Sequence, residues 1–153
     1  MGLDQYAYVA SKAGQRDEFY DQEGIYFDPE KGGWVVPEGG MQKPRQISYW
    51  RKHPNLHGWM EKLWNRKNQP GIDHSNPNPM NDVPVFNGVE LELTWEDIDE
   101  LERAIRHGQL PHTTGFFFGD PSDDYYREQD LKFCIDAKAE LFLKRKVFYN
   151  SSW

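Results

Sequence analysis

The most suggestive spacing in the chain is a pair of histidines. His53 and His57 are four residues apart, and on a helix this interval places two imidazoles on one face, where they could share a metal ion. Pro54 restricts His53 to extended backbone, however, so His53 should lie outside the helix, and the glutamate of a zinc-protease motif is missing. We therefore expect capping or surface histidines and no metal site.

The strongest candidate for ligand binding is the segment 49–53. It places two aromatic rings beside three potential cations at the predicted start of a helix: Tyr49, Trp50, Arg51, Lys52 and His53. Such a composition can stack a planar ring and pair with phosphate. The alternative is an ordinary surface in which cations flank a buried tryptophan.

A second motif is His112 followed two residues later by Thr114. It is one copy of the His-x-Thr element, of which two-histidine phosphoesterases use two, so that one histidine acts as base and the other as acid. None of the other histidines has Ser or Thr two places later. His112 and Thr114 are therefore predicted to contribute to the ligand site. Together with His57 they are the alternative catalytic set of a small phosphoesterase or other hydrolase.

The motifs of the common cofactor-dependent enzymes are missing from the sequence. There is no Walker loop, no GxGxxG and no GxSxG, and the acids around Asp120 lack the glycine-punctuated pattern of a calcium loop. Cys134 is the only cysteine, which excludes an intrachain disulfide, and it is expected in the core. We therefore expect no cofactor, and we expect no catalytic residues if the protein acts by binding.

Charge is unevenly distributed along the chain. The net charge of −7 disfavours binding of nucleic acid or anionic lipid. Residues 43–67 carry seven basic residues and one acid, whereas residues 90–102 carry seven acids and no base. These segments are interpreted as two solvated faces that partly neutralise each other. Alternatively, residues 90–102 are an acidic decoy for a nucleic-acid-binding host protein.

Strands are predicted by apolar alternation and turn residues, at 3–9, 25–27, 34–36, 89–93, 114–118 and 147–149. Residues 3–9 are apolar or aromatic on both faces, which favours a central place in the sheet. Residues 25–27 and 34–36 flank a proline and a glycine pair, so they should form a hairpin. Residues 47–52 either form a strand or begin a helix.

Helices are predicted from Pro54, over 95–107, and after Ser122. The first has an apolar stripe at Leu56, Trp59, Met60, Leu63 and Trp64. The second has Thr94 as N-cap and Gly108 as the residue that ends it. The third is expected to bury Leu131, Phe133, Cys134, Ile135, Ala137, Leu141 and Phe142.

These elements indicate one α+β domain over residues 1–153. Its mixed or antiparallel sheet of about five or six short strands should pack against about three helices, with an exposed Asn/Pro-rich loop at 68–84. No basic, apolar leader and no run of 18 apolar residues is found, so we expect a cytoplasmic protein without membrane contact.

Four segments together resemble a family of small proteins of tailed phages, including cyanophages. The segments are MGLDQYAYV at 1–9, YWRKHPNLHGWM at 49–60, LPHTTGFFFG at 110–119 and VFYNSSW at 147–153. Members sometimes carry a phosphoglycerate kinase label, but this chain is too short for that two-domain enzyme and lacks its phosphate-cradling loop. The resemblance implies an accessory role in host takeover or counter-defence inside the host cell.

We therefore expect a protein that acts by binding rather than by catalysis. Its partner would be a host protein or a nucleotide-like small molecule, held by the segment 49–53 with help from His112 and Thr114. The same reading allows a homo-oligomer. The alternatives are the nucleotide phosphoesterase and the acidic decoy described above.

Overall fold

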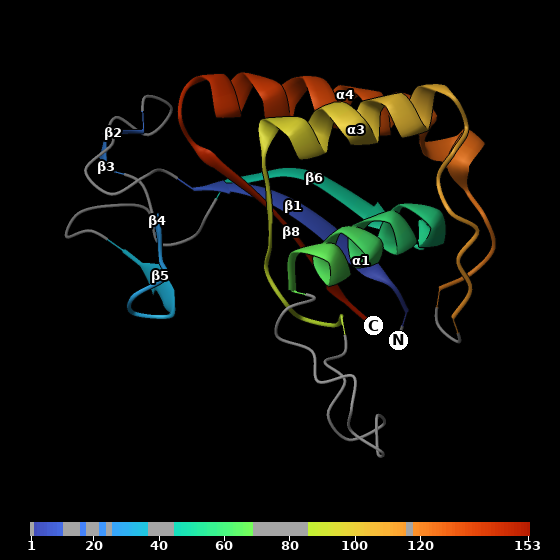
Figure 1. The fold of residues 1–153 in the computed structure, drawn as a ribbon, viewed down its shortest axis with the longest axis horizontal. Coiled ribbons are helices and arrows are strands. Elements are labelled where there is room, and N and C mark those ends of the chain that lie inside the picture. The colour runs from blue at the N-terminus through green and yellow to red at the C-terminus, as the bar shows by residue number, and fades with distance from the viewer. Residues whose placement is uncertain are drawn as a thin grey trace, which may run out of the picture.

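A four-stranded antiparallel sheet forms the centre of the computed structural model, which describes residues 2–10, 16–17, 22–23, 26–36, 45–68, 86–115 and 118–153. The strand order is β6-β1-β8-β7. The strands are β1 (Asp4–Ala10), β6 (Arg45–Arg51), β7 (Leu91–Leu93) and β8 (Lys146–Ser152). The two ends of the chain therefore supply the two central strands, which lie side by side in Figure 1.

Alternation along β1 divides its side chains between the two faces of the sheet. Gln5, Ala7 and Val9 are buried, and Ala7 and Val9 pair with Tyr149 and Val147 of β8, which are buried too. This face carries the hydrophobic core. Small and β-branched side chains in the middle of the sheet leave room for the helices that cover it.

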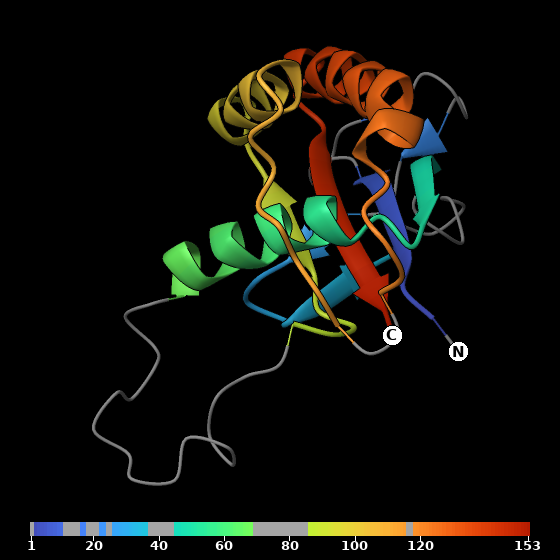
Figure 2. The same cartoon turned by 90° about the vertical axis from the view of Figure 1, so that its right-hand side faces the viewer.

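Three helices cover this face: α1 (Pro54–Asn68), α3 (Trp95–Arg106) and α4 (Asp123–Phe142). α3 and α4 lie side by side, and α1 crosses the sheet below them (Figures 1 and 2). α3 begins with a capping box in which Thr94 and Asp97 satisfy each other's backbone N–H groups. Its apolar stripe, Ile98, Leu101 and Ile105, is buried, as its helical spacing predicts.

The opposite face of the sheet is partly covered by a hairpin of β4 (Tyr26–Asp28) and β5 (Gly33–Val35). The Trp34 ring of this hairpin lies 5.8 Å from the Tyr8 ring and 4.9 Å from the Phe148 ring, measured between centroids. A short pair of strands, β2 (Arg16–Asp17) and β3 (Gln22–Glu23), precedes the hairpin. The predicted hairpin is thus confirmed. The separate pair of β2 and β3 was not predicted.

The connection from α3 to α4 packs against α1 at a glycine. A Cβ atom at Gly58 would lie 1.8 Å from Oγ1 of Thr113, so only glycine admits the chain this close to the helix. The Thr113 amide also donates to the Asn55 side chain, at 2.9 Å. These contacts hold residues 110–115 beside the first turns of α1.

The α+β class, the antiparallel sheet and the three helices are confirmed. The strand expected over 114–118 is wrong at residues 114, 115 and 118, which form turn and loop, while 116–117 lie outside the described residues. The expected loop 68–84 also lies outside them, except that Asn68 ends α1.

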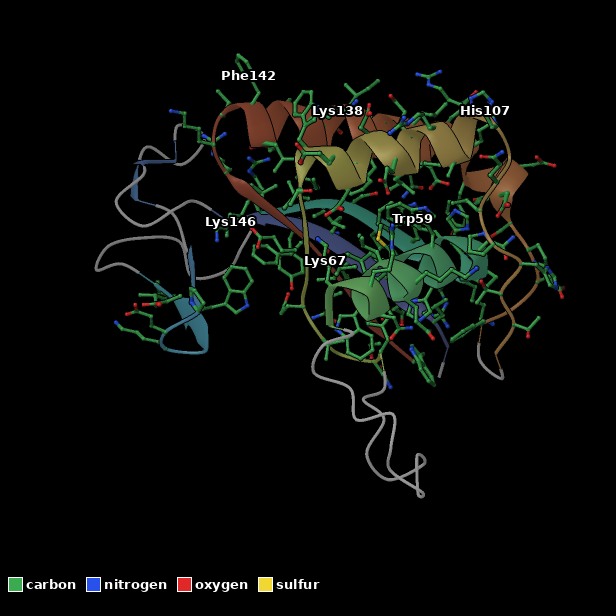
Figure 3. All side chains as sticks on the ribbon, viewed as in Figure 1. Trp59, Lys67, His107, Lys138, Phe142 and Lys146 are labelled. Carbon is green, nitrogen blue, oxygen red and sulfur yellow. The ribbon has the colours of Figure 1, made fainter. Side chains whose placement is uncertain are left out.

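The apolar face expected for α4 is only partly correct. Asp130, Phe133, Cys134 and Ala137 are its buried residues, whereas Ile135 is 59% and Phe142 is 79% exposed. Figure 3 shows Phe142 pointing away from the sheet. Within the described ranges, no helix is long and apolar enough to cross a bilayer.

Candidate functional site

Strand alternation splits the predicted ligand segment between surface and interior. Tyr49, Arg51 and Lys52 are exposed, whereas the Trp50 and His53 side chains are fully buried. The β6 side chains alternate because they lie on a pleated strand, which explains the separation of Trp50 from its neighbours. Trp50 and His53 therefore cannot contact a ligand directly in this conformation.

Asp130 of α4 is the buried centre to which both of these side chains are hydrogen bonded. The Trp50 indole Nε1 donates to Asp130 Oδ1 at 2.8 Å, and His53 Nε2 lies 2.8 Å from Asp130 Oδ2. Indole can only donate, and a buried carboxylate needs donors on both oxygens. Burial raises the pKa of Asp130, while the His53 and Trp50 contacts oppose that rise.

Gln5 of β1 fixes the backbone of the same junction. Its side chain donates to the carbonyl of His53 at 3.1 Å and accepts from the His53 amide at 2.9 Å. The N-terminus of α1 is thus held by β1 through Gln5 and by α4 through Asp130. Buried polar groups paired in this way fix one geometry, because any alternative would leave them unsatisfied.

Lys52, between β6 and α1, has a left-handed backbone with φ of 55°. Lys144 shares this conformation, but it follows α4, where a left-handed residue ordinarily ends a helix. Lys52 ends no helix, so its strain of about 1 kcal/mol must be offset by neighbours. Its amide donates to Leu3 O at 2.8 Å, and its carbonyl accepts from Ser122 Oγ at 3.0 Å.

The Lys52 side chain passes over two glycines before it reaches solvent. A Cβ at Gly119 would lie 3.1 Å from Lys52 Cδ, and one at Gly2 would lie 3.1 Å from Lys52 Cε. Gly119 has a φ of +81°, which also favours glycine. The methylene stem is therefore seated, while its ammonium has no ion pair with the described residues.

Arg51 and Tyr49 share one acceptor on β1. Tyr49 Oη donates to Asp4 Oδ1 at 2.6 Å, and Arg51 Nη1 donates to the same oxygen at 2.7 Å. The hydrogen bond from Tyr49 and the Arg51 guanidinium lower the pKa of Asp4, and the bond to Asp4 raises the pKa of Tyr49. Two exposed side chains are thereby held in fixed positions.

Two tyrosines at the start of α4 complete this surface. Tyr126 Oη donates to Arg51 O at 2.7 Å and accepts from the Arg51 amide at 3.1 Å, so it closes the edge of β6. The Tyr126 ring stacks on His53, with centroids 4.8 Å apart. Tyr125 packs edge-on against Tyr126 and is 82% exposed. We call Tyr49, Arg51, Lys52 and Tyr125 the corner.

Ser122, His53 and Asp130 lie in the order of a nucleophile, a base and its orienting acid. Ser122 Oγ is 3.5 Å from His53 Nδ1, but its hydrogen bond to Lys52 O is the shorter one. His53 is also fully buried beneath Tyr126, so its ring cannot pass a proton to a substrate. The arrangement therefore fits a structural clamp at the two helix starts.

His57 occupies a separate, aromatic site on the inner side of α1. Its Nδ1 lies 2.8 Å from Tyr149 Oη, and its ring stacks on Phe86 at 5.1 Å. The ring edges of Phe118 and Trp153 complete the enclosure. Nε2 is buried and has no hydrogen-bond partner among the described residues. Burial without a charged partner lowers the pKa of His57 to about 4.

The remaining predicted site residues lie apart from each other. His112 and Thr114 are exposed, while Thr113 between them faces α1. His57 is buried behind Phe118, so the alternative catalytic set His57, His112 and Thr114 does not form one accessible site. His53 and His57 make different contacts, and no group of metal-binding residues occurs in the part of the chain that is described.

The acids of α3 are largely neutralised by basic residues. Lys67 pairs with Asp97 and Arg66 with Glu100, so the basic and acidic segments face each other across α1 and α3. Lys138 of α4 contacts both Asp99 and Glu102. This confirms the interpretation of two faces that partly neutralise each other, and it leaves little free acid for a decoy.

Sequence reasoning missed the contributions of Asp4, Tyr125 and Asp130. No local pattern marks Asp130, because its partners, Trp50 and His53, are distant in sequence. Tyr125 could have been found, since the buried stripe of α4 extends back through Tyr126 and leaves Tyr125 outside it. Comparison with protein-family models, with curated proteins and with solved structures gives no match.

The first prediction concerns Asp130. Asp130→Ala leaves the Trp50 and His53 donors buried without a partner, so we expect the free energy of unfolding to fall by about 3 kcal/mol. Asp136→Ala on the same helix removes only an ion pair with the exposed Lys132, and should cost less than about 1 kcal/mol. Urea unfolding measures both. Equal losses would show that Asp130 has no special role.

The second prediction concerns pH. His57 stays neutral in the folded protein down to about pH 4, whereas in the unfolded chain it takes up a proton near its ordinary pKa of 6.5. Stability is therefore lost as the pH falls from 6.5 to 4. Between pH 7 and 4.5, wild type should lose about 2–3 kcal/mol more than His57→Gln. Parallel stability curves for the two proteins would contradict the assignment.

Proposed function

We propose that this protein is a phage-encoded accessory protein that acts by binding a host protein, in host takeover or counter-defence. The corner supplies the contact surface. The phage origin is supported by the resemblance of residues 1–9, 49–60, 110–119 and 147–153 to proteins of tailed phages. The binding mode is supported by the chemistry and rigidity of the corner.

The observation that carries the proposal is that exposed anchors are fixed by hydrogen bonds and ring contacts with their neighbours. Tyr and Arg are the side chains most enriched at the energetic centres of protein interfaces. Here Tyr49 and Arg51 are held by Asp4, Lys52 by its own backbone, and Tyr125 by Tyr126. Groups that are already ordered lose little entropy on binding.

The shape of the corner favours a protein surface as its partner. Tyr125 keeps 82% of its surface free and Tyr49 keeps 41%, so both project from the surface. The charges nearby are mixed, because Asp4 accepts from Arg51 while the Lys52 ammonium has no ion pair within the described part of the chain. A partner with carboxylates opposite Lys52 and an apolar patch opposite Tyr125 would complement this surface.

The third prediction tests this surface with matched variants. Tyr125→Ala, Arg51→Ala and Lys52→Ala are combined in one protein. The control combines Phe142→Ala, Arg103→Ala and Lys144→Ala: Phe142 is 79% exposed on the same helix, Arg103 is a paired surface arginine, and Lys144 has the same left-handed backbone. Both triple variants remove the same charge and similar exposed apolar area.

Tagged wild type and both variants are incubated with host lysate, and the retained proteins are quantified by mass spectrometry. We expect wild type and the control to retain the same host protein, and the corner variant to lose at least about tenfold of it, as for loss of interface anchors. Unfolding curves check that all three proteins are folded. Equal retention by the corner variant would refute the proposal.

A further inference from the structure

A hollow on the outer side of α1, away from the corner, contains a second set of aromatic and basic residues. It has a volume of about 460 Å³ and is lined by Trp59, Lys62, Asn65 and Arg66. This volume lies in the range of small-molecule sites, about 300–1,000 Å³. Trp59 is labelled on α1 in Figure 3, beneath α3 in that view.

Helix geometry aligns these side chains. Trp59, Lys62 and Arg66 are at positions i, i+3 and i+7, which form one stripe along α1. Trp59 is half-buried and packs against the core with part of its ring, so its position is fixed by the interior. The stripe therefore begins with an anchored ring, continues with Lys62 about one turn further on and ends with Arg66 about two turns further on.

The two cations of the hollow have little to hold them in the protein. Lys62 is exposed and makes no ion pair with a described residue. Among the described residues, Arg66 has an ion pair with Glu100 alone, at 3.5 Å, and both side chains are about half exposed, so this pair contributes little. Lys67, by contrast, is tied to Asp97 and to the carbonyl of Glu92. Within the described ranges, Lys62 has no ion pair and Arg66 has a weak one, so both can receive an anion.

We infer that this hollow binds a nucleoside monophosphate, with the base against Trp59 and the phosphate between Lys62 and Arg66. Aromatic stacking accepts any base, because each base has a π face. The two cations match the charge of one phosphate dianion, and the arginine fork suits its oxygens. The Asn65 amide can donate to or accept from a polar edge of the base or ribose.

A second hollow provides a comparison within the same molecule. It measures about 390 Å³ and is lined by Arg45, Gln46, Ile47, Asp136, Ala139 and Glu140. Its lining includes no aromatic ring, and the Arg45 guanidinium is already paired with Glu140 at 2.7 Å. Of these two hollows, only the one on α1 combines an aromatic ring with cations that are not strongly paired.

The site is tested by isothermal titration of AMP, GMP, CMP and UMP, with adenosine and inorganic phosphate as partial ligands. We expect saturable binding of one nucleotide per chain, and weaker binding of either partial ligand. Trp59→Leu and, separately, Lys62→Ala should weaken the binding about tenfold or more, as for loss of a stacked base or a phosphate contact. Leucine retains an apolar side chain at position 59, and unfolding curves check each variant.

Trp95→Leu is the matched control. Trp95 is 45% exposed and has the Lys138 ammonium 5.2 Å from its ring centroid, so it offers an aromatic and a cation outside the hollow. Trp95→Leu should bind nucleotide as wild type does. No saturable binding of any of the four nucleotides would overturn the inference, and so would equal losses in Trp59→Leu and Trp95→Leu.

The inference does not depend on the function proposed for the corner. The triple variant of Tyr125, Arg51 and Lys52 should bind nucleotide with wild-type affinity, because none of these residues lines the hollow. Loss of nucleotide binding in that variant would place the nucleotide at the corner and overturn the inference. If the chain binds nucleotide but retains no host protein, the nucleotide site in the hollow stands and only the function proposed for the corner is refuted.

Discussion

The carboxylate of Asp130 is the interaction on which the surface of this protein depends. One side chain of α4 receives the indole of Trp50 from β6 and the imidazole of His53 at the entrance to α1. Three elements that are distant in sequence therefore meet at one buried acid. Removing a carboxylate from water is costly, and here the cost is offset only while both donors are in place. The junction is thus confined to one arrangement.

The backbone that carries Arg51 and Lys52 lies between the two residues that this buried junction holds. Lys52 lies between Trp50 and His53 in the chain, and its backbone is in the left-handed region. Leu3, Gly2 and Gly119 accommodate the result, and Tyr126 covers His53 while it holds the backbone of Arg51. A strained, exposed lysine beside two fixed side chains is an arrangement that packing alone does not require.

Much of the fold could be predicted from local patterns. The N-cap of α3, the stripe of α1, the central place of β1 and the alternation in β7 are consequences of short-range sequence, and each was predicted correctly. The strand expected at 114–118 is absent at residues 114, 115 and 118, and the tertiary contact of the preceding Thr113 with Gly58 of α1 outweighs local β propensity there. Ile135 was placed inside although the neighbouring layers cover only the opposite side of α4.

The construction of the candidate site could not be predicted from the sequence. Segment 49–53 does reach the surface, through Tyr49, Arg51 and Lys52, but two of its five side chains are buried. No local pattern shows that Trp50 and His53 are bound by an acid 77 or more residues away. The most direct measurement is hydrogen exchange by NMR at the Trp50 indole N–H and the amides of Lys52 and His53, compared with amides of β1 and β8. A preorganised corner predicts that all of them exchange only through global unfolding, with the same opening free energy. Faster exchange at the three junction sites, through a separate local opening, would contradict the account.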